Sequence, residues 1–355
     1  MKTRRQFLKV TTVAVGPTIL GATNKSVRKH PVVGSGEHRY EVIHDWGQIP
    51  THIKLGNTHG IVEDSSGRIY LCHTVHGNSD SDHTMLAFDE KGQFIKSWGS
   101  EFRGGAHGLH LQKDAEGEFL YLTDTGKGRR KGIHPDFTNV VKMTLSGEEV
   151  FRIGYPKHSP YYEVDSEGQP ATKYSPTNIA IAENGDIYIG DGYGAYRISH
   201  YKKNGEFVRT FGEHGKKPGQ LWRPHGLIVD KRRGKEELLV ADRTNNRLQY
   251  FSMEGKYLRI EKGVNRPCHF DERDGVLLIP DLAARVTLMD RYNQVVAHLG
   301  EDTTGDYEER RKKSRDEFIP GKFICPHGAC FDHEGNIFVA EWVEIGRITK
   351  LRKVS

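Results

Sequence analysis

The chain has 355 residues, a net charge of +5, 40 glycines and a hydrophobic fraction of 35%. Seven of its lysines and arginines lie within residues 1–30, which hold no acidic residue, so the rest of the chain is close to neutral and gives no electrostatic reason to expect a nucleic acid partner. The glycine-rich composition favours an all-β protein over a helical one.

The chain begins with a pattern typical of twin-arginine export signals. The motif reads Thr3-Arg4-Arg5-Gln6-Phe7-Leu8-Lys9, and an apolar run from Val10 to Leu20 follows it. The alternative is a membrane anchor, but so short a run does not span a bilayer comfortably. We therefore predict a signal peptide and linker over residues 1–30, with the cleavage site open, and no membrane span after its removal. The mature protein is expected to be periplasmic or secreted through twin-arginine export.

After residue 38 the sequence repeats one pattern six times. Each repeat opens with His or Asn before an apolar stretch and an acid-Gly turn, and continues with a strand ending near Asp and two further strands. The openings are spaced 48, 71, 47, 44 and 58 residues apart, at His59, His107, Asn178, His225, His269 and His327. Four short strands every roughly 40–50 residues are typical of propeller blades. The sequence therefore predicts an all-β fold, a six-bladed β-propeller, over residues 38–355.

The last repeat lacks a fourth strand. From His327 the chain has room for three strands before it reaches Ser355. The segment Tyr40–Gly47 resembles the closing strands of other repeats, such as Phe94–Gly99 and Phe207–Gly212. We expect this N-terminal strand to complete the last blade, because closure removes an exposed sheet edge.

Two repeats carry additional length. Residues 126–175 include Pro156, Pro160 and Pro170 and are expected to form an extended loop over one face of the propeller. Residues 301–323 are dense in charge and are expected to form a solvated loop with at most one helical turn. A lid over the channel mouth remains an alternative for this loop.

Five of the six repeat openings are histidines, and the inner strands of a propeller bring such positions together around one mouth of the central channel. Blades 2, 4 and 6 are related by about 120° around the axis of a six-bladed ring. His107, His225 and His327 can therefore meet one metal ion and leave its channel side open, which is the arrangement of catalytic zinc rather than structural zinc. We predict that these three histidines bind the metal.

The other alternate set of blades is a weaker choice. Blade 3 offers Asn178, a poor ligand for a transition metal, and so leaves this set with only His59 and His269. These two histidines are expected to support the metal ligands or to contact the substrate. Zinc is the expected ion, although other divalent transition metals bind three-histidine sites as well.

The four cysteines, Cys72, Cys268, Cys325 and Cys330, do not show zinc-finger spacing. Cys268 and Cys325 each lie beside a histidine of interest. They could pair in an oxidising compartment, contact the metal, or remain buried free thiols.

A family resemblance rests on several motifs. They are Pro176-Thr177-Asn178, Asp191-Gly192-Tyr193, Pro218-Gly219-Gln220, Pro224-His225 and Ala241-Asp242-Arg243-Thr244-Asn245-Asn246-Arg247. On these residues the chain resembles the peptidyl-α-hydroxyglycine α-amidating lyases, within the NHL-repeat propellers. The similarity runs through most of residues 55–350. It implies zinc on His107, His225 and His327, which is the set that blade geometry favours.

The resemblance also implies a catalytic tyrosine at Tyr193 and an accompanying arginine at Arg243. As a phenolate, Tyr193 would act as general base on a substrate hydroxyl, and Arg243 would stabilise its negative charge. In the simpler alternatives, Tyr193 is an ordinary aromatic residue of its blade and Arg243 makes a structural contact between blades.

The chain departs from the family pattern at three positions. Thr74 stands where the family has an arginine that grips the substrate carboxylate, and Cys325 replaces a methionine. Gly328 replaces an acidic calcium ligand, which puts a Ca²⁺ ion in doubt. We predict that His73 and His76 contact the substrate in place of the missing arginine; the alternative is that both are solvated loop residues.

Together these features predict a metal-dependent lyase-type enzyme, with zinc as the expected ion, that acts on a small hydroxylated or carboxylated molecule or on a peptide. A sugar-acid lyase or lactone hydrolase on the same metal site is the alternative within the enzyme class. A non-catalytic propeller that binds a partner or carbohydrate is the alternative outside it. The sequence does not predict an oligomeric state.

Overall fold

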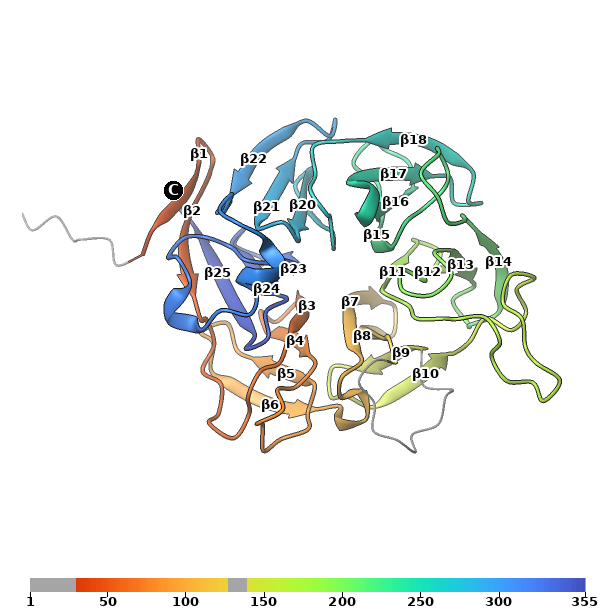
Figure 1. Ribbon diagram of the computed structural model, residues 1–355, viewed down its shortest axis with the longest axis horizontal. Helices are drawn as coiled ribbons and strands as arrows, with labels where there is room; N and C mark the ends of the chain where they lie inside the picture. Colours follow the sequence, from red (N-terminus) through yellow and green to blue (C-terminus); the bar gives the residue numbers. More distant parts are fainter. Residues whose placement is uncertain (1–29, 127–138, 355) are drawn as a thin grey trace, which may run out of the picture.

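A computed structural model describes residues 30–126 and 139–354, and the predicted export leader lies outside the described residues. Six antiparallel sheets surround a central axis (Figure 1). This arrangement confirms the prediction of an all-β, six-bladed propeller. Among the described residues, no helix combines the length and the apolar character needed to cross a membrane.

Blades 1 to 3 each have four strands, and the first strand of each lies at the channel. Blade 1 consists of β3 (Thr58–Glu63), β4 (Ile69–His73), β5 (Met85–Phe88) and β6 (Phe94–Trp98). Blade 2 consists of β7 (Ala106–Asp114), β8 (Gly117–Asp124), β9 (Asn139–Thr144) and β10 (Glu149–Ile153). Blade 3 consists of β11 (Asn178–Ile181), β12 (Ile187–Gly190), β13 (Ile198–Tyr201) and β14 (Phe207–Phe211).

Blades 4 and 5 repeat this order, and blade 6 draws strands from both ends of the described chain. Blade 4 consists of β15 (Pro224–Asp230), β16 (Glu237–Asp242), β17 (Arg247–Phe251) and β18 (Tyr257–Glu261). Blade 5 consists of β19 (Asp271–Arg273), β20 (Val276–Asp281), β21 (Arg285–Met289) and β22 (Val295–Leu299). Blade 6 consists of β23 (Pro326–Phe331), β24 (Ile337–Glu341), β25 (Arg347–Lys353), β2 (His38–His44) and β1 (Val32–Ser35).

The N-terminal strand closes the ring as predicted. Strand β2 pairs antiparallel with β25, from Tyr40 opposite Lys353 to His44 opposite Thr349. Strand β1 then pairs with β2 and gives blade 6 a fifth strand, which the sequence analysis did not anticipate. The four residues of β1 are only half buried or exposed, so their hydrophobic pattern is weak.

The hydrophobic core lies between neighbouring blades. Between blades 6 and 1, for example, the Trp46 ring packs edge-on against Phe338 and Phe88, with ring centroids 4.6 and 5.7 Å away. Such edge-to-face pairs stabilise the contact beyond the burial of apolar area alone. Because each sheet is buried on both faces by its neighbours, closure of the ring fixes the positions of all six inner strands.

Buried acidic residues at the ends of the second strands anchor loops on the face of the propeller where the inner strands begin. Asp242 accepts hydrogen bonds from the Trp222 amide at 2.7 Å, the Asn245 side chain at 2.8 Å and Arg247 Nε at 2.7 Å. The repeated strand-ending acid in the sequence therefore has a structural role in this blade. Asn245 and Arg247, which belong to the motif that begins at Asp242, both bind this carboxylate. Arg243 of the same motif does not take part in this anchoring.

The charged insertion before blade 6 contains the α-helical turn α1 (Tyr307–Arg310), as the sequence allowed, and also a short 3-10 turn (Arg315–Glu317) beyond the one that was expected. It is not fully solvated, because Arg310 is buried and makes an ion pair with Asp302 at 3.1 Å. Arg311 stacks on Trp342 with its guanidinium carbon 3.5 Å from the ring centroid, and it donates to the Asn57 side chain at 2.7 Å. The insertion thus packs onto blades 6 and 1.

A buried ion pair in blade 6 gives the first prediction. Arg347 is paired with Glu341, and both side chains are fully buried. Replacing Arg347→Met would leave an uncompensated buried carboxylate, so we expect the free energy of unfolding in urea to fall by about 3–5 kcal/mol. The matched control is Arg352→Met on the same strand, where an exposed pair with Glu41 is lost and the expected fall is below about 1 kcal/mol. Equal losses in the two variants would contradict this account.

Candidate metal centre

Four inner strands share a local feature at the start of the blade. Each contains a His-Gly pair where the pairing with the second strand shifts register, in a β-bulge. A bulge changes the direction in which a side chain points and is common next to functional sites. The four pairs are His59-Gly60, His107-Gly108, His225-Gly226 and His327-Gly328. Blade 3 opens with Asn178-Ile179 and shows no register shift.

The glycines allow neighbouring inner strands to approach closely. A Cβ atom added at Gly108 would lie 2.5 Å from the Thr177 carbonyl oxygen of the next blade. At Gly328 the added Cβ would lie 2.1 Å from the His59 carbonyl oxygen, which no side chain can tolerate. Gly328 therefore permits a contact between blades at the position where the related family has an acidic calcium ligand.

The same carbonyl oxygens orient the histidine rings. The Nδ1 atom of His107 lies 2.8 Å from the Thr177 oxygen, and that of His225 lies 2.6 Å from the Cys268 oxygen. The Nδ1 atom of His327 lies 3.2 Å from the carbonyl oxygen of His59. Because a carbonyl only accepts, Nδ1 carries the proton in each ring and Nε2 keeps its lone pair. This tautomer is the one that presents Nε2 to a metal.

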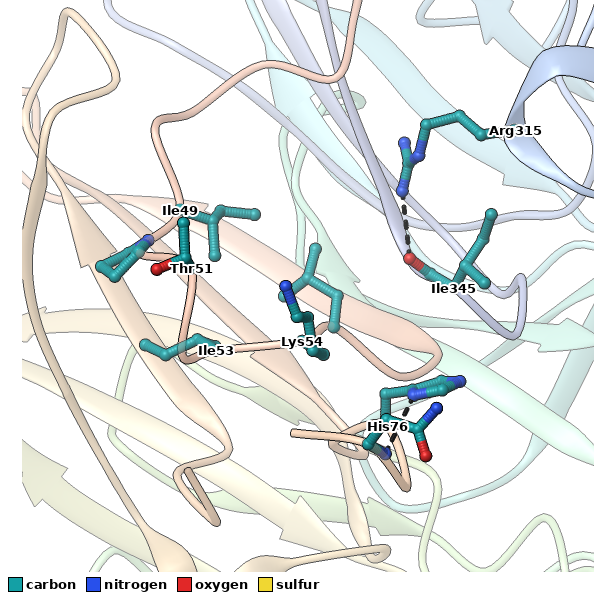
Figure 2. Close-up of a pocket in the computed structure, with 10 residues that line it drawn as sticks. Ile49, Thr51, Ile53, Lys54, His76, Arg315 and Ile345 are labelled. Carbon is teal, nitrogen blue, oxygen red and sulfur yellow. Dashed lines mark hydrogen bonds between the residues drawn. The ribbon is translucent and has the colours of Figure 1, made fainter. Parts of the chain in front are cut away.

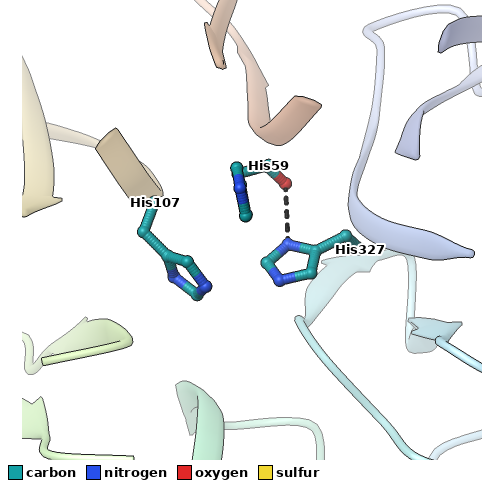
Figure 3. A group of neighbouring side chains, drawn as sticks. All are labelled: His59, His107 and His327. Carbon is teal, nitrogen blue, oxygen red and sulfur yellow. Dashed lines mark hydrogen bonds between the residues drawn. The ribbon is translucent and has the colours of Figure 1, made fainter. Parts of the chain in front are cut away.

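The four rings form a tight group at the channel axis. His107, His225 and His327, the predicted ligands, have ring centroids separated by 4.9, 4.7 and 4.7 Å. His59 joins them at 4.6 Å from His107 and 4.5 Å from His327 (Figure 3). All four side chains are buried. The structure thus brings the predicted set together and adds His59 to it.

The candidate ligand atoms form two groups, and neither is the predicted set of three. In one group the ligand atoms of His59, His107 and His327 all lie within 4.8 Å of one another. In the other, those of His225, Cys268 and His327 do. The hydroxyl of Tyr193 lies between the Nε2 atoms of His107 and His225, at 3.1 Å from each. The phenol oxygen therefore lies between two of the three predicted ligands, and its single proton can be donated to either nitrogen.

Arg243 lies beside this tyrosine. Its Nη1 atom is 3.3 Å from the Tyr193 hydroxyl and 3.9 Å from Cys268 Sγ, and its guanidinium carbon is 5.3 Å from the phenol ring centroid. Burial alone would lower the pKa of Arg243, but Tyr193 and Cys268 raise it above its ordinary value, so the guanidinium is positively charged. Arg243 therefore places a fixed positive charge next to the phenol oxygen.

A tight turn holds Tyr193 in place. Asp191 accepts the Ser175 and Ala195 amides at 2.7 and 2.6 Å, and the Tyr162 hydroxyl from the long loop at 2.8 Å. An added Cβ at Gly192 would lie 2.1 Å from the Pro224 carbonyl oxygen. The Asp-Gly-Tyr motif is therefore a positioning device, and the loop over residues 154–177 takes part in it.

The electrostatics of the ring suit a transition metal. Burial, Arg243 and His107 lower the pKa of His225 well below its ordinary value. Burial and the neighbouring imidazoles, His59 first among them, do the same for His327, whose Nε2 has no hydrogen-bond partner among the described residues. Neutral imidazoles with Nε2 lone pairs are the donor set that zinc, copper and iron prefer, so the residues fit such an ion.

The cysteines are free thiols. All four are buried, and none is in a disulfide among the described residues. Burial raises the pKa of Cys268 to about 11, although Arg243 opposes this, and the thiol donates weakly to the Arg266 carbonyl at 3.6 Å. Of the alternatives left open by the sequence, the structure shows unpaired thiols and places Cys268 within reach of the metal ligands.

His269 lies apart from the ring. The pairing of β19 with β20, which follows His269 in blade 5, shows no register shift. The Nδ1 atom of His269 is 3.3 Å from the Ala329 carbonyl oxygen. It lines a channel cavity of about 210 Å³ together with His110 and Asp271. Burial and His110 lower the pKa of His269 to about 4, so it is neutral at neutral pH. Its placement offers it to the channel interior rather than to the group of four rings.

His73, the last residue of β4, and His76, in the loop that follows, have different surroundings. His73 is buried, and its Nδ1 atom accepts the amides of Gly56 and Val75 at 3.2 and 3.1 Å. Burial lowers the pKa of His73 to about 3, so the neutral ring organises the loop. His76 instead lines a cavity of about 520 Å³ (Figure 2). Of the two predicted substrate contacts, only His76 borders this cavity.

This cavity lies on the face where the inner strands begin. Lys54 and Arg315 contribute positive charge to it, and the apolar side chains are Ile49, Pro50, Ile53, Leu55 and Ile345. Arg315 is paired with Asp45. Thr74, which stands where the family has an arginine, uses its hydroxyl to accept the Asn57 amide at 3.1 Å. The cavity was not predicted from the sequence because its lining comes from four separate segments, residues 49–55, residues 76–78, Arg315 and Ile345.

Comparison with known proteins identifies relatives of the chain, although no protein-family model matches it. The chain is 33% identical over 235 residues to peptidyl-glycine alpha-amidating monooxygenase B of Xenopus laevis. The matched segment covers 58% of this chain but 24% of the frog protein. It is 27% identical over 218 residues to human NHL repeat-containing protein 3, covering 60% of this chain and 57% of that protein. Peptidyl-alpha-hydroxyglycine alpha-amidating lyase 1 of Drosophila melanogaster is 25% identical over 227 residues, 56% of this chain and 38% of the fly protein.

Solved structures confirm the fold. A gluconolactonase from Xanthomonas campestris superposes with a TM-score of 0.57 at 12% identity, covering 91% of this chain and 95% of that one. Virginiamycin B lyase from Staphylococcus aureus superposes with a TM-score of 0.55 at 13% identity, covering 88% and 100%. The chain is therefore a six-bladed β-propeller whose relatives include peptidylglycine amidating monooxygenases and hydroxyglycine amidating lyases.

Proposed function

We propose that this protein is a metal-dependent lyase-type enzyme that acts on a small α-hydroxylated molecule carrying a carboxylate. The observation that carries the proposal is the Tyr193 hydroxyl, which lies 3.1 Å from two imidazole nitrogens and 3.3 Å from an arginine. A phenol held among metal-type donors and a fixed cation has the surroundings of a general base. The similarity to amidating lyases supports the same reading.

His107, His225 and His327 would hold the metal, for which zinc is the proposed ion. When bound, such an ion supplies Lewis-acid stabilisation of negative charge on a substrate oxygen. The backbone carbonyls that accept from Nδ1 keep the three rings in orientation. Ligand rings oriented in this way need little reorganisation when the ion binds.

Tyr193 would remove the proton of the substrate hydroxyl. Arg243 stabilises the phenolate because its positive charge lies next to the phenol oxygen in a buried site. In an α-hydroxyglycine unit, loss of the hydroxyl proton lets the oxygen form a C=O bond while the adjacent C–N bond breaks. The departing amide nitrogen takes up a proton, so the products are an amide and glyoxylate. No redox partner is needed.

The cavity beside His76 would bind the remainder of the substrate. Lys54 supplies positive charge for a carboxylate, and the isoleucine and leucine side chains supply an apolar surface. This arrangement would serve in place of the arginine that the family has at the position of Thr74. It favours a substrate with an acidic group next to an apolar one.

We also propose that the protein works outside the cytoplasm, after twin-arginine export. The support is the sequence motif at Thr3–Lys9, which lies outside the described residues. Export of a protein that has already folded would be compatible with a metal bound before transport.

Metal content is the first test of this function. We expect about one equivalent of zinc per chain in the wild type by elemental mass spectrometry, and little in His225→Ala, because a ligand is lost. The control is His298→Ala, an outer-strand histidine that pairs with Thr287 and is expected to keep the metal. A wild-type chain without stoichiometric metal would contradict the proposal.

Activity after loss of the phenol hydroxyl is the second test. With an N-acyl-α-hydroxyglycine as substrate and glyoxylate release as the readout, Tyr193→Phe is expected to lower kcat roughly a hundredfold or more. Its metal content should be unchanged, because the tyrosine is not a required ligand. Tyr292→Phe, an exposed tyrosine, is the matched control. Full activity of Tyr193→Phe would contradict the assigned base, and turnover of a sugar lactone alone would favour the hydrolase alternative.

A further inference from the structure

We propose that His59 is a fourth imidazole ligand, so that the metal centre of this protein is a four-histidine site. The inference rests on the proposed function, since it concerns the same ion, and it changes the coordination chemistry expected there. His59 comes from blade 1, outside the alternate-blade set of His107, His225 and His327.

The positions of the rings support a fourth ligand. The His59 centroid is 4.6 Å from His107 and 4.5 Å from His327, which is as close as the three other ligands are to one another. A ligand atom of His59 also lies within 4.8 Å of those of His107 and His327. His225 approaches the same two rings at 4.9 and 4.7 Å. His107 and His327 are therefore common to both triangles, so an ion held by these two rings would be within reach of both His59 and His225.

The local architecture of His59 is that of the other ligands. It precedes a glycine, it lies in a β-bulge, and it is buried, as are the three predicted ligands. An added Cβ at Gly60 would lie 2.5 Å from Leu109 Cβ in the next blade, so this glycine also permits close contact between blades. His269, the other histidine at a blade opening, is followed by Phe270 and lacks the bulge. The His-Gly bulge thus separates the four ring histidines from the fifth.

The backbone around His59 is tied to two other ligands. The Gly60 amide donates to Cys72 Sγ at 3.2 Å, and that thiol donates to the His107 carbonyl at 3.2 Å. The His59 carbonyl accepts from His327 Nδ1. The start of β3 is therefore hydrogen-bonded both to the backbone at His107 and to the ring of His327.

A fourth imidazole has a definite consequence. A tetrahedral zinc ion with four histidine ligands has no open position, which is the condition of a structural site. Substrate can then reach the ion only if the coordination number is five or six. This geometry is accessible to zinc in a reacting complex and is preferred by octahedral first-row ions.

Cobalt substitution tests the coordination number directly. The full chain is loaded with Co²⁺, and its visible absorption and Co²⁺ affinity are compared with those of His59→Ala. In the wild type we expect the weak absorption bands of five- or six-coordinate Co²⁺. In His59→Ala we expect the intense bands of four-coordinate Co²⁺, and an affinity for Co²⁺ that is lower, on the order of tenfold to a hundredfold. His110→Ala, a channel-lining histidine on β7, is the control and should match the wild type.

The outcomes separate this inference from the proposed function. If His59→Ala keeps the wild-type spectrum and affinity, the centre has three histidines and the inference is wrong, while the proposed function stands. If the wild type binds no stoichiometric Co²⁺, both fail. Should His59→Ala not fold by circular dichroism, pulsed electron paramagnetic resonance of Cu²⁺ in the wild type counts the imidazoles instead. Four supports the proposal and three overturns it.

Discussion

The structure depends on the close contact between neighbouring inner strands at the His-Gly bulges. Glycine removes the side chain that would collide with the carbonyl of the next blade, and that carbonyl then accepts the Nδ1 proton of the histidine in three of the four pairs. One geometric condition therefore brings the strands together and directs the Nε2 atoms to the axis. Replacing such a glycine would disturb both.

Ring closure and metal-site geometry are consequently coupled. The four ring histidines come from four blades, so their separation is set by the packing of aromatic and aliphatic side chains between the sheets. The phenol of Tyr193 lies between His107 and His225 because a turn anchored by Asp191 and Tyr162 holds it there. A rigid scaffold of this kind suits chemistry that relies on electrostatic preorganisation.

The repeat phrase was sufficient to predict the propeller, the six blades and the closing N-terminal strand, because each blade needs its neighbours to bury its faces. The predicted proximity of His107, His225, His327, Tyr193 and Arg243 could also be inferred from motif and symmetry. The sequence placed His59 and His269 at the same mouth but could not tell which of them joins the group, because a β-bulge changes the direction of a side chain without a strong sequence signal. The His-Gly dipeptide that distinguishes His59 from His269 is present in the sequence. Its meaning became clear only from the close contacts between neighbouring inner strands.

Anomalous X-ray diffraction at the zinc absorption edge, on crystals of the full chain, tests the central claim most directly. The account predicts one strong anomalous peak at the channel axis, in contact with the Nε2 atoms of His107, His225 and His327, with the Tyr193 hydroxyl beside it. Absence of a peak at the ring, in protein supplied with zinc, would contradict a metal centre at this site. A peak elsewhere on the molecule would contradict it equally.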